Sequence, residues 1–244
     1  MNDVQYQKHF IPLESNPEVF TKLSHKLGVA ESLRFVDIWA LDEVEHLPRP
    51  ALALVLVFPT SAEYEQRKSA EDAGRQEYTK ILGDGLTWLP QTINNACGLY
   101  AILHAACNGD VRLSIRPKSL LAGFIDAFQT RQPRDCAKFL EDSTDLETIY
   151  KEAAMQGDSS VPMDAQEEVD FHYVCFVKTK HSCIFEMDGD RKGPIDKGVK
   201  LKPEDDMLSA VSIAVVKECI ERESSRNLNF SLMALVETKS SDGA

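Results

Sequence analysis

A cysteine lies where a buried helix is expected to begin. Cys97 belongs to QTINNACGLYAILHAACNG (91–109), in which two asparagines precede the cysteine and a mostly apolar run follows it. The free N–H groups and the dipole of a helix N-terminus stabilise a thiolate and can hold an oxyanion. Gly98 would leave room beside the sulfur for a substrate carbonyl. The position is consistent with a nucleophile, and the alternative is a buried thiol that packs like alanine.

A nucleophilic cysteine needs a base, and the base needs an orienting partner. His172 and Asp188 lie in VDFHYVCFVK (169–178) and HSCIFEMDG (181–189), which we expect to form a β-hairpin. A turn at 179–181 places the two side chains directly opposite one another, and a two-residue turn places them one position off; both allow contact. The alternative is a strand histidine beside a surface aspartate. The remaining histidines have weaker claims to this role: His9, His25, His46, His104 and His181.

Gln91 is a candidate for a second oxyanion donor. Its amide can donate hydrogen bonds without competing for the catalytic proton. Its place just before the predicted helix would let it act beside the backbone N–H of Cys97. The alternative is a solvated glutamine in a loop.

The elements that must position these groups follow from hydrophobic periodicity. Helices are predicted from Pro17 to a closing Gly28, over 97–107, and near 117–128 with Pro117 at its start. A further helix is predicted to start at Pro203. Residues 61–85 are predicted to be an exposed helix or a loop insertion. Strands are predicted over 34–42, 51–58, the two hairpin segments and 230–237, and the apolar 51–58 is expected to be central and buried on both faces. The pattern indicates a single α+β domain over residues 1–244.

Composition restricts the class of protein. The chain has 244 residues, of which 43% are hydrophobic and 27% charged, as in soluble globular proteins. The start of the sequence lacks the pattern of a signal peptide, so we expect the cytoplasm, and also the nucleus, as the location. The six cysteines include no CxxC pair, which indicates free thiols and no metal site. A formal net charge of −12 disfavours nucleic acid and anionic membranes as partners and favours a basic ligand.

Together these segments resemble the ubiquitin carboxyl-terminal hydrolases, a family of papain-like cysteine proteases. QTINNACGLYAILHAACN resembles the nucleophile region, and PLESNPEVF, FVDIWALDE, LPRP, LVLVFP, VDFHYVCFV, IFEMDGDRKGPI and FSLMALV occur in the family's order over most of the chain. The resemblance implies a papain-like α+β fold, with a central, mostly antiparallel sheet wrapped by helices and a crossover loop at the active site. The carboxylate motif departs from the family's usual ELDGR, since this chain has EMDGDR, which leaves the register of the hairpin turn open.

The resemblance also implies the roles of the site residues. Cys97 is the nucleophile, His172 the general base and acid, Asp188 its orienting partner and Gln91 the oxyanion donor. These roles agree with those inferred from the residues alone. Neither a metal nor an organic cofactor is expected. The implied reaction is hydrolysis at the C-terminal glycine of ubiquitin through an acyl-enzyme.

Three residues are candidates for substrate binding: Glu14, Asn95 and Glu168. Glu14 in PLESNP matches a family position near bound ubiquitin, and its alternative role is to support the following helix. Residues 152–177 contain six acidic side chains, Glu168 among them, and neither Lys nor Arg. This acidic stretch is expected to attract a basic ubiquitin tail and to favour a protonated His172; its alternative is a solvated loop.

The polar segment 151–168 is predicted to be the crossover loop, which would restrict leaving groups to small adducts, short extensions and unfolded tails. Ubiquitin is the expected partner of a monomeric enzyme, with a ubiquitin-like modifier as an alternative. A non-catalytic ubiquitin-binding protein would not need all four catalytic candidates. A redox pair of Cys97 and Cys107 is disfavoured, since ten residues of helix separate them by about 15 Å.

Overall fold

The apolar stretch predicted at 51–58 forms the central strand of the sheet. The structure is a computed structural model that describes residues 6–81, 85–156, 171–223 and 229–238. In β3 (Ala51–Pro59), alternate side chains enter two hydrophobic cores, with Val55 in one and Leu54 and Leu56 in the other. All three are buried, so the prediction of a strand buried on both faces is confirmed.

Six strands form one antiparallel sheet in the order β2-β8-β3-β5-β6-β7. The other five strands are β2 (Leu33–Asp37), β5 (Phe171–Lys178), β6 (Cys183–Met187), β7 (Ile195–Lys200) and β8 (Ser231–Glu237). A separate parallel pair joins β1 (Lys8–His9) to β4 (Ile93–Asn94) and brings the N-terminal segment alongside the residues that precede Cys97.

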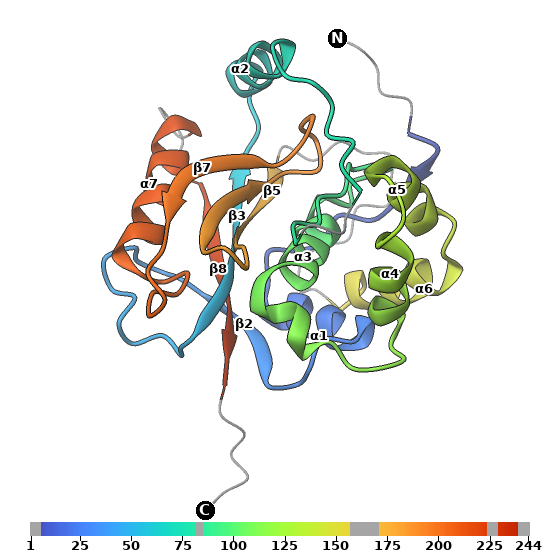
Figure 1. Cartoon of the computed structure of the whole chain (residues 1–244), viewed down its shortest axis with the longest axis horizontal. Helices are drawn as coiled ribbons and strands as arrows, with labels where there is room; N and C mark the ends of the chain where they lie inside the picture. Colours follow the sequence, from blue (N-terminus) through green and yellow to red (C-terminus); the bar gives the residue numbers. More distant parts are fainter. Residues whose placement is uncertain (1–5, 82–84, 157–170, 224–228, 239–244) are drawn as a thin grey trace, which may run out of the picture.

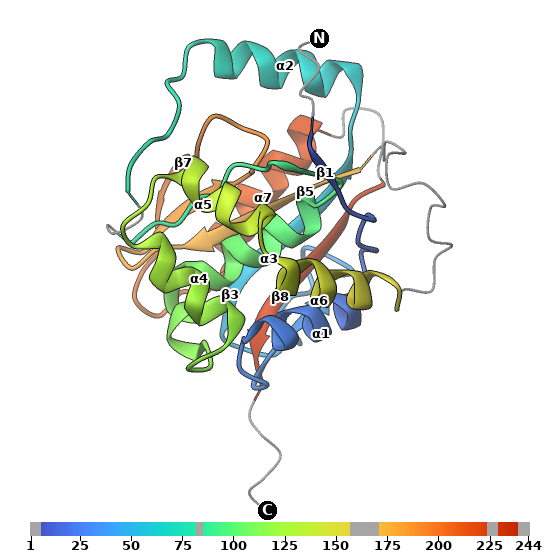
Figure 2. The same cartoon turned by 90° about the vertical axis from the view of Figure 1, so that its right-hand side faces the viewer.

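Helices cover both faces of the sheet, which gives the expected α+β fold (Figure 1). On one side lie α1 (Pro17–Leu27), α3 (Cys97–Cys107), η1 (Gly109–Ser114), α4 (Leu120–Phe128), α5 (Pro133–Glu141) and α6 (Thr144–Ala154). On the other side lies α7 (Ala210–Glu223). Figure 2 shows α2 (Ala62–Ala73) crossing the top of the molecule, outside both layers.

Two helices begin later than expected. The hydroxyl of Ser119 caps α4, so that helix does not start at Pro117. Helix α7 begins at Ala210 and not at Pro203. The reason is that Asp206 lies outside the helix and accepts a hydrogen bond from the N–H of Ala51 at the start of β3 (3.1 Å).

The predicted hairpin of β5 and β6 forms, but with a different register. Cys175 pairs with Met187, and the chain reverses at residues 180–182, where Ser182 adopts a left-handed φ of 63°. This register points residue 190, and not Asp188, toward the position opposite His172. Neither predicted register, direct opposition or an offset of one position, is therefore present. They still meet, because Asp188 directly follows β6 and diagonal neighbours on adjacent strands lie within reach of side chains.

Helix α6 takes up the first residues of the predicted crossover segment. The helix continues to Ala154, so the expected loop does not begin at residue 151. Residues 157–168 of that segment, including Glu168, lie outside the described residues. The connection leads from α6 to β5, whose second residue is His172. Within the described ranges, no helix combines the length and the apolar character needed to cross a membrane.

Candidate active site

Cys97 is the first residue of α3, as predicted. The first helical hydrogen bond of this region runs from Tyr100 N–H to Ala96 O (3.0 Å), so the N–H groups of residues 97 to 99 precede the helical ladder. Cys97 is partly accessible, whereas the rest of the helix is buried. Gly98 does not serve the predicted role of leaving room for a substrate. A Cβ at this position would lie 3.2 Å from the side chain of Leu13, so the glycine permits close packing in the core.

His172 lies between the sulfur of Cys97 and the carboxylate of Asp188. Its Nε2 lies 2.7 Å from Oδ1 of Asp188, and the Cys97 side chain is close enough to the ring to act on the pKa of His172. Because Asp188 engages Nε2, Nδ1 is the ring nitrogen left for the sulfur. Burial alone lowers the pKa of His172, but the charge and the hydrogen bond of Asp188 outweigh burial and raise this pKa well above 6.5. The site therefore favours an imidazolium.

Asp188 is held from several sides. Its side chain is only 2% exposed, its Oδ1 accepts the backbone N–H of Asp190 (2.9 Å), and its backbone carbonyl accepts the indole N–H of Trp88 (2.9 Å). Burial alone would raise its pKa, yet the charge and the hydrogen bond of His172 lower it to about 2. The carboxylate is therefore charged over the whole physiological pH range.

Gln91 lies against the loop that carries Asp188. Its backbone N–H donates to the carbonyl of Gly189 (2.7 Å), and a Cβ on Gly189 would come within 3.0 Å of Gln91. Within the described part of the chain, the buried Oε1 of Gln91 has no hydrogen-bond partner. The unpaired atom is an acceptor, so it is distinct from the Nε2 donor that the predicted oxyanion role requires.

His104 supports the segment before Gln91 and has no catalytic geometry. The N–H of Leu89 donates to its Nε2 (3.0 Å), which requires that nitrogen to be unprotonated. Complete burial lowers the pKa of His104 to about 4, so this ring is neutral at physiological pH.

The candidates for substrate binding lie in different settings. Asn95 adopts a left-handed φ of 58° in the turn between β4 and α3, a conformation that asparagine tolerates well. Glu14 is half-buried, and its charge acts on the hydroxyl of Tyr173, the residue after His172. The neighbouring Ser15 donates to Ser231 at the start of β8 (3.0 Å). Glu14 therefore lies near the end of the sheet where β5 begins and where His172 lies.

Four residues at this site were not predicted from the sequence: Tyr6, Tyr64, Lys68 and Asp190. The Tyr64 hydroxyl donates to Oδ2 of Asp188 (3.5 Å), and Lys68 forms an ion pair with Asp190. Burial, followed by the charge of Asp190, raises the pKa of Tyr6 to about 12. One signal was available, because Asp190 is the extra residue in EMDGDR.

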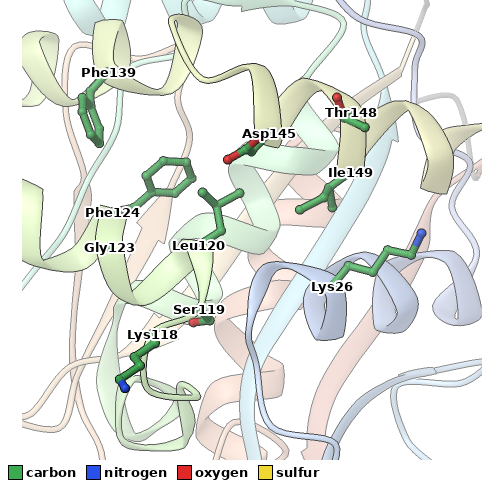
Figure 3. Close-up of a pocket in the computed structure, with 10 residues that line it drawn as sticks. All are labelled: Lys26, Lys118, Ser119, Leu120, Gly123, Phe124, Phe139, Asp145, Thr148 and Ile149. Atoms are coloured by element: carbon green, nitrogen blue, oxygen red, sulfur yellow. The ribbon is translucent and has the colours of Figure 1, made fainter.

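A groove elsewhere on the surface has a different composition. Its volume is about 640 Å³, and Figure 3 shows Leu120, Phe124, Phe139 and Ile149 among the side chains that line it. Its lining residues include neither cysteine nor histidine. The groove therefore lacks the residues of the thiol chemistry described above.

The geometry also bears on the redox alternative. Cys97 and Cys107 lie at opposite ends of the continuous helix α3, so a disulfide between them would require unwinding. Burial raises the pKa of the Cys107 thiol to about 12, which keeps it protonated. A redox pair is therefore disfavoured.

Comparisons with known proteins agree on one family. Residues 10–221 match the family model described as ubiquitin carboxyl-terminal hydrolase, family 1. A probable ubiquitin carboxyl-terminal hydrolase of Dictyostelium discoideum is 30% identical over 235 residues, which cover 96% of this chain and 90% of that protein. Human ubiquitin carboxyl-terminal hydrolase isozyme L1 is 31% identical over 228 residues, which cover 92% of this chain and 96% of that protein.

A solved structure shows the same fold. The catalytic domain of Trichinella spiralis UCH37, bound to ubiquitin vinyl methyl ester, matches with a TM-score of 0.74 at 22% identity. The match covers 96% of this chain and 98% of that one. At this level of identity the similarity concerns the architecture alone.

Proposed function

The chain belongs to family 1 of the ubiquitin carboxyl-terminal hydrolases and is a cysteine-type ubiquitin hydrolase, and from this premise we propose that it releases small adducts, short extensions and unfolded tails from the C-terminal glycine of ubiquitin. The observation that carries the proposal is the convergence of three side chains from separate elements. Cys97 comes from α3, His172 from β5 and Asp188 from the end of β6.

The acylation step begins with a thiolate on Cys97 and an imidazolium on His172. The sulfur attacks the carbonyl carbon of the ubiquitin glycine, and the resulting oxyanion accepts hydrogen bonds from the Cys97 N–H and the Gln91 amide. When the intermediate collapses, the bond to the leaving group breaks and His172 gives its proton to the departing amine or thiol. Asp188 keeps the ring oriented and stabilises its charged form.

Deacylation reverses the use of the imidazole. Neutral His172 takes a proton from water, and the hydroxide attacks the thioester carbonyl. The carbon–sulfur bond then breaks, which restores the thiolate on Cys97 beside the imidazolium and frees the ubiquitin carboxylic acid, which releases its remaining proton to solvent. The residues proposed here complete the cycle with neither a metal ion nor an organic cofactor.

Ubiquitin is proposed to dock at the end of the sheet where β5 begins and where His172 lies. His172 pairs with Phe58 near the end of β3. Ser231, the first residue of β8, pairs with the adjacent Val57, so β8 begins at the same end of the sheet. Strand β2 ends here as well, and two residues beyond its end Trp39 is 92% exposed. Tryptophan is enriched among residues that dominate binding energy, so this side chain is a suitable anchor.

Replacing Trp39 with alanine is expected to raise KM for ubiquitin substrates at least about tenfold while kcat changes little, because the anchor is remote from the reacting bond. Leu113→Ala provides the matched control. Leu113 is 86% exposed in η1, near the opposite end of β5, where Gly109 approaches the carbonyl of Lys178. Equal KM values for the two variants would exclude Trp39 as an anchor.

The other candidates complete the binding surface. Glu14 lies near this same end of the sheet, and Asn95 precedes the nucleophile. Glu168 belongs to the acidic stretch that would attract the basic tail of ubiquitin. The segment between α6 and β5 is proposed to pass over the active site and limit the size of the leaving group. The protein is proposed to act as a monomer in the cytoplasm or nucleus, on ubiquitin and on neither nucleic acid nor membranes.

Turnover of a fluorogenic amide of the ubiquitin C-terminus tests the proposal. Cys97→Ala should abolish turnover and retain ubiquitin binding, whereas Cys183→Ala, which removes another partly accessible thiol, should retain turnover. A parallel assay with a ubiquitin-like modifier measures the preference between substrates. If Cys97→Ala turned over the amide at the native rate, the assignment of the nucleophile would be wrong.

A further inference from the structure

Helix α2 contacts the loop that carries the catalytic carboxylate. We define the carboxylate loop as residues 188–194, between β6 and β7. The hydroxyl of Tyr64 donates to Oδ2 of Asp188 (3.5 Å), and one turn later Lys68 forms an ion pair with Asp190. The two contacts are four residues apart on α2, so they share one face of the helix.

The same face continues along the carboxylate loop. One turn after Lys68, Asp72 accepts two hydrogen bonds from the guanidinium of Arg191 (3.0 and 3.1 Å). Just past the helix, Arg75 donates to the carbonyl of Pro194 (2.8 Å). Successive turns of α2 therefore hold successive residues of the loop.

Lys68 is well placed to control the position of Asp190. The Lys68 side chain is 14% exposed, its Nζ lies 5.4 Å from the centroid of the Tyr64 ring, and its second carboxylate partner is Glu65 at 2.8 Å. A cation held by two carboxylates and an aromatic face has little freedom to leave the pair.

Asp190 connects this ion pair to the active site. Its backbone N–H donates to Oδ1 of Asp188, the same oxygen that contacts His172. Its carboxylate is 36% exposed. Partial burial and the charge of Asp188 raise the pKa of Asp190, whereas His172 and Lys68 act in the opposite direction. Without Lys68, a second negative charge would stand beside the catalytic carboxylate with less compensation.

We propose that Lys68 is a positioning residue for the catalytic carboxylate. Its ion pair with Asp190 keeps the Asp190 N–H on Asp188 and offsets a negative charge that would otherwise act on His172. The inference rests on the catalytic role proposed for Asp188. It adds an electrostatic link from α2, an element outside both layers of the fold, to the imidazole.

The groups around Asp190 determine how the link responds to pH. Asp188 faces it from the carboxylate loop, His172 from β5, Lys68 from α2 and Tyr6 from the N-terminal segment. Glu65 reaches it through Lys68. Burial and the Asp190 charge raise the pKa of Tyr6 to about 12, so its phenol is neutral near pH 7. Lys68 and Asp190 are therefore opposing charges whose separate removal should move the imidazole in opposite directions.

The test is the pH profile of kcat/KM for the full chain with the fluorogenic ubiquitin amide. Its basic limb reports loss of the proton from the His172 imidazolium. Lys68→Met removes a positive charge, so the limb should move to higher pH by roughly half a unit, and kcat/KM at its optimum should fall about tenfold. Asp190→Asn removes a negative charge, so the limb should move to lower pH by a similar amount.

Two further variants separate this effect from a general loss of structure. Lys68→Arg retains the charge and should restore the native limb. The double variant Lys68→Met with Asp190→Asn is neutral at both positions and should bring the limb back near its native pH. Lys138→Met on α5 breaks an exposed pair with Asp142 and is the control, with no expected shift.

Each result then bears on the inference. An activity loss in Lys68→Met with an unmoved limb would mean that the lysine only supports folding, and the inference would fail. It would also fail if the double variant showed the sum of two losses in place of recovery. If Lys68→Met does not fold, Asp190→Asn still tests the inference, because Lys68 keeps its ion pair with Glu65 in that variant. An unmoved basic limb in Asp190→Asn would refute the link. Failure of the proposed function has a separate signature, which is turnover by Cys97→Ala.

Discussion

Replacing Asp188 with asparagine removes the catalytic charge and preserves the shape of the side chain. In the native protein, Nε2 of His172 and Oδ1 of Asp188 are 2.7 Å apart in a buried setting. An asparagine amide that donates to Nε2 would leave the imidazole proton on Nδ1, the nitrogen that faces Cys97. The ring would then be unable to accept a proton from the thiol.

The size of the effect follows from the pKa of Asp188. This pKa is about 2, compared with an ordinary value of 3.8, even though burial alone would raise it. The shift corresponds to roughly 2 to 3 kcal/mol, at about 1.4 kcal/mol for each pKa unit. If the transition state loses this stabilisation, kcat/KM falls by one to two orders of magnitude.

Stability should show the same interaction with a defined dependence on pH. Asp188 has a depressed pKa in the folded state, so its contribution is present above 3.8 and is lost as the pH falls toward 2. His172 has a raised pKa, so its contribution is present below 6.5 and is lost as the pH rises through the raised value. The free energies of unfolding of the native protein and Asp188→Asn should differ most between 3.8 and 6.5, and converge in stronger acid.

Two measurements test this reasoning. Turnover of the fluorogenic ubiquitin amide gives kcat/KM, and urea denaturation at several pH values gives the free energy of unfolding. Asp196→Asn is the matched control, because this exposed carboxylate on β7 accepts the N–H of Gly198, a hydrogen bond that asparagine can also accept. If Asp188→Asn kept kcat/KM within about threefold of the native value and matched its stability at every pH, the proposed role of Asp188 would be refuted.

Three further predictions concern the surroundings of the triad. Gly189→Ala places a Cβ within 3.0 Å of Gln91, so the unfolding free energy should fall by about 2 kcal/mol and kcat/KM at least about tenfold; Gly123→Ala, which meets nothing within 4 Å, should do neither. Arg191→Met removes the nearer guanidinium partner of the buried Asp72, which keeps Arg75 at 3.8 Å and the N–H of Lys192 at 3.2 Å, and should destabilise the protein by about 2 kcal/mol in urea denaturation; an unchanged midpoint would contradict the pairing. Inserting about ten Gly/Ser residues between α6 and β5 should permit cleavage between folded ubiquitins, since a longer segment passes bulkier leaving groups; an unchanged preference on diubiquitin would argue against a size gate.

The elements that carry the site are predictable because their sequences have strong local signals. The run of aromatic and β-branched residues after His172 favours a strand, and the almost uncharged stretch after Cys97 favours a buried helix. The register between β5 and β6 does not follow from the same information. It depends on which residues form the turn, and the left-handed conformation of Ser182, a residue without a strong preference for it, shifts the pairing. Asp188 nevertheless reaches the imidazole, because a diagonal contact tolerates a register that direct opposition does not.

The role of α2 was not predictable from hydrophobic periodicity. The face it turns toward the carboxylate loop contains Tyr64, Lys68 and Asp72, which recur every four residues but include no aliphatic side chain. A polar helix of this kind has the composition of a solvated surface helix, and its partner is a loop, which has no periodicity of its own. Opposite charges on α2 and on the loop can pair in many ways in an unfolded chain. Only burial selects among these pairs, since a carboxylate such as Asp72 is stable away from water when a guanidinium meets it there. The electrostatics of the active site therefore depend on an element whose importance appears only once the chain is folded.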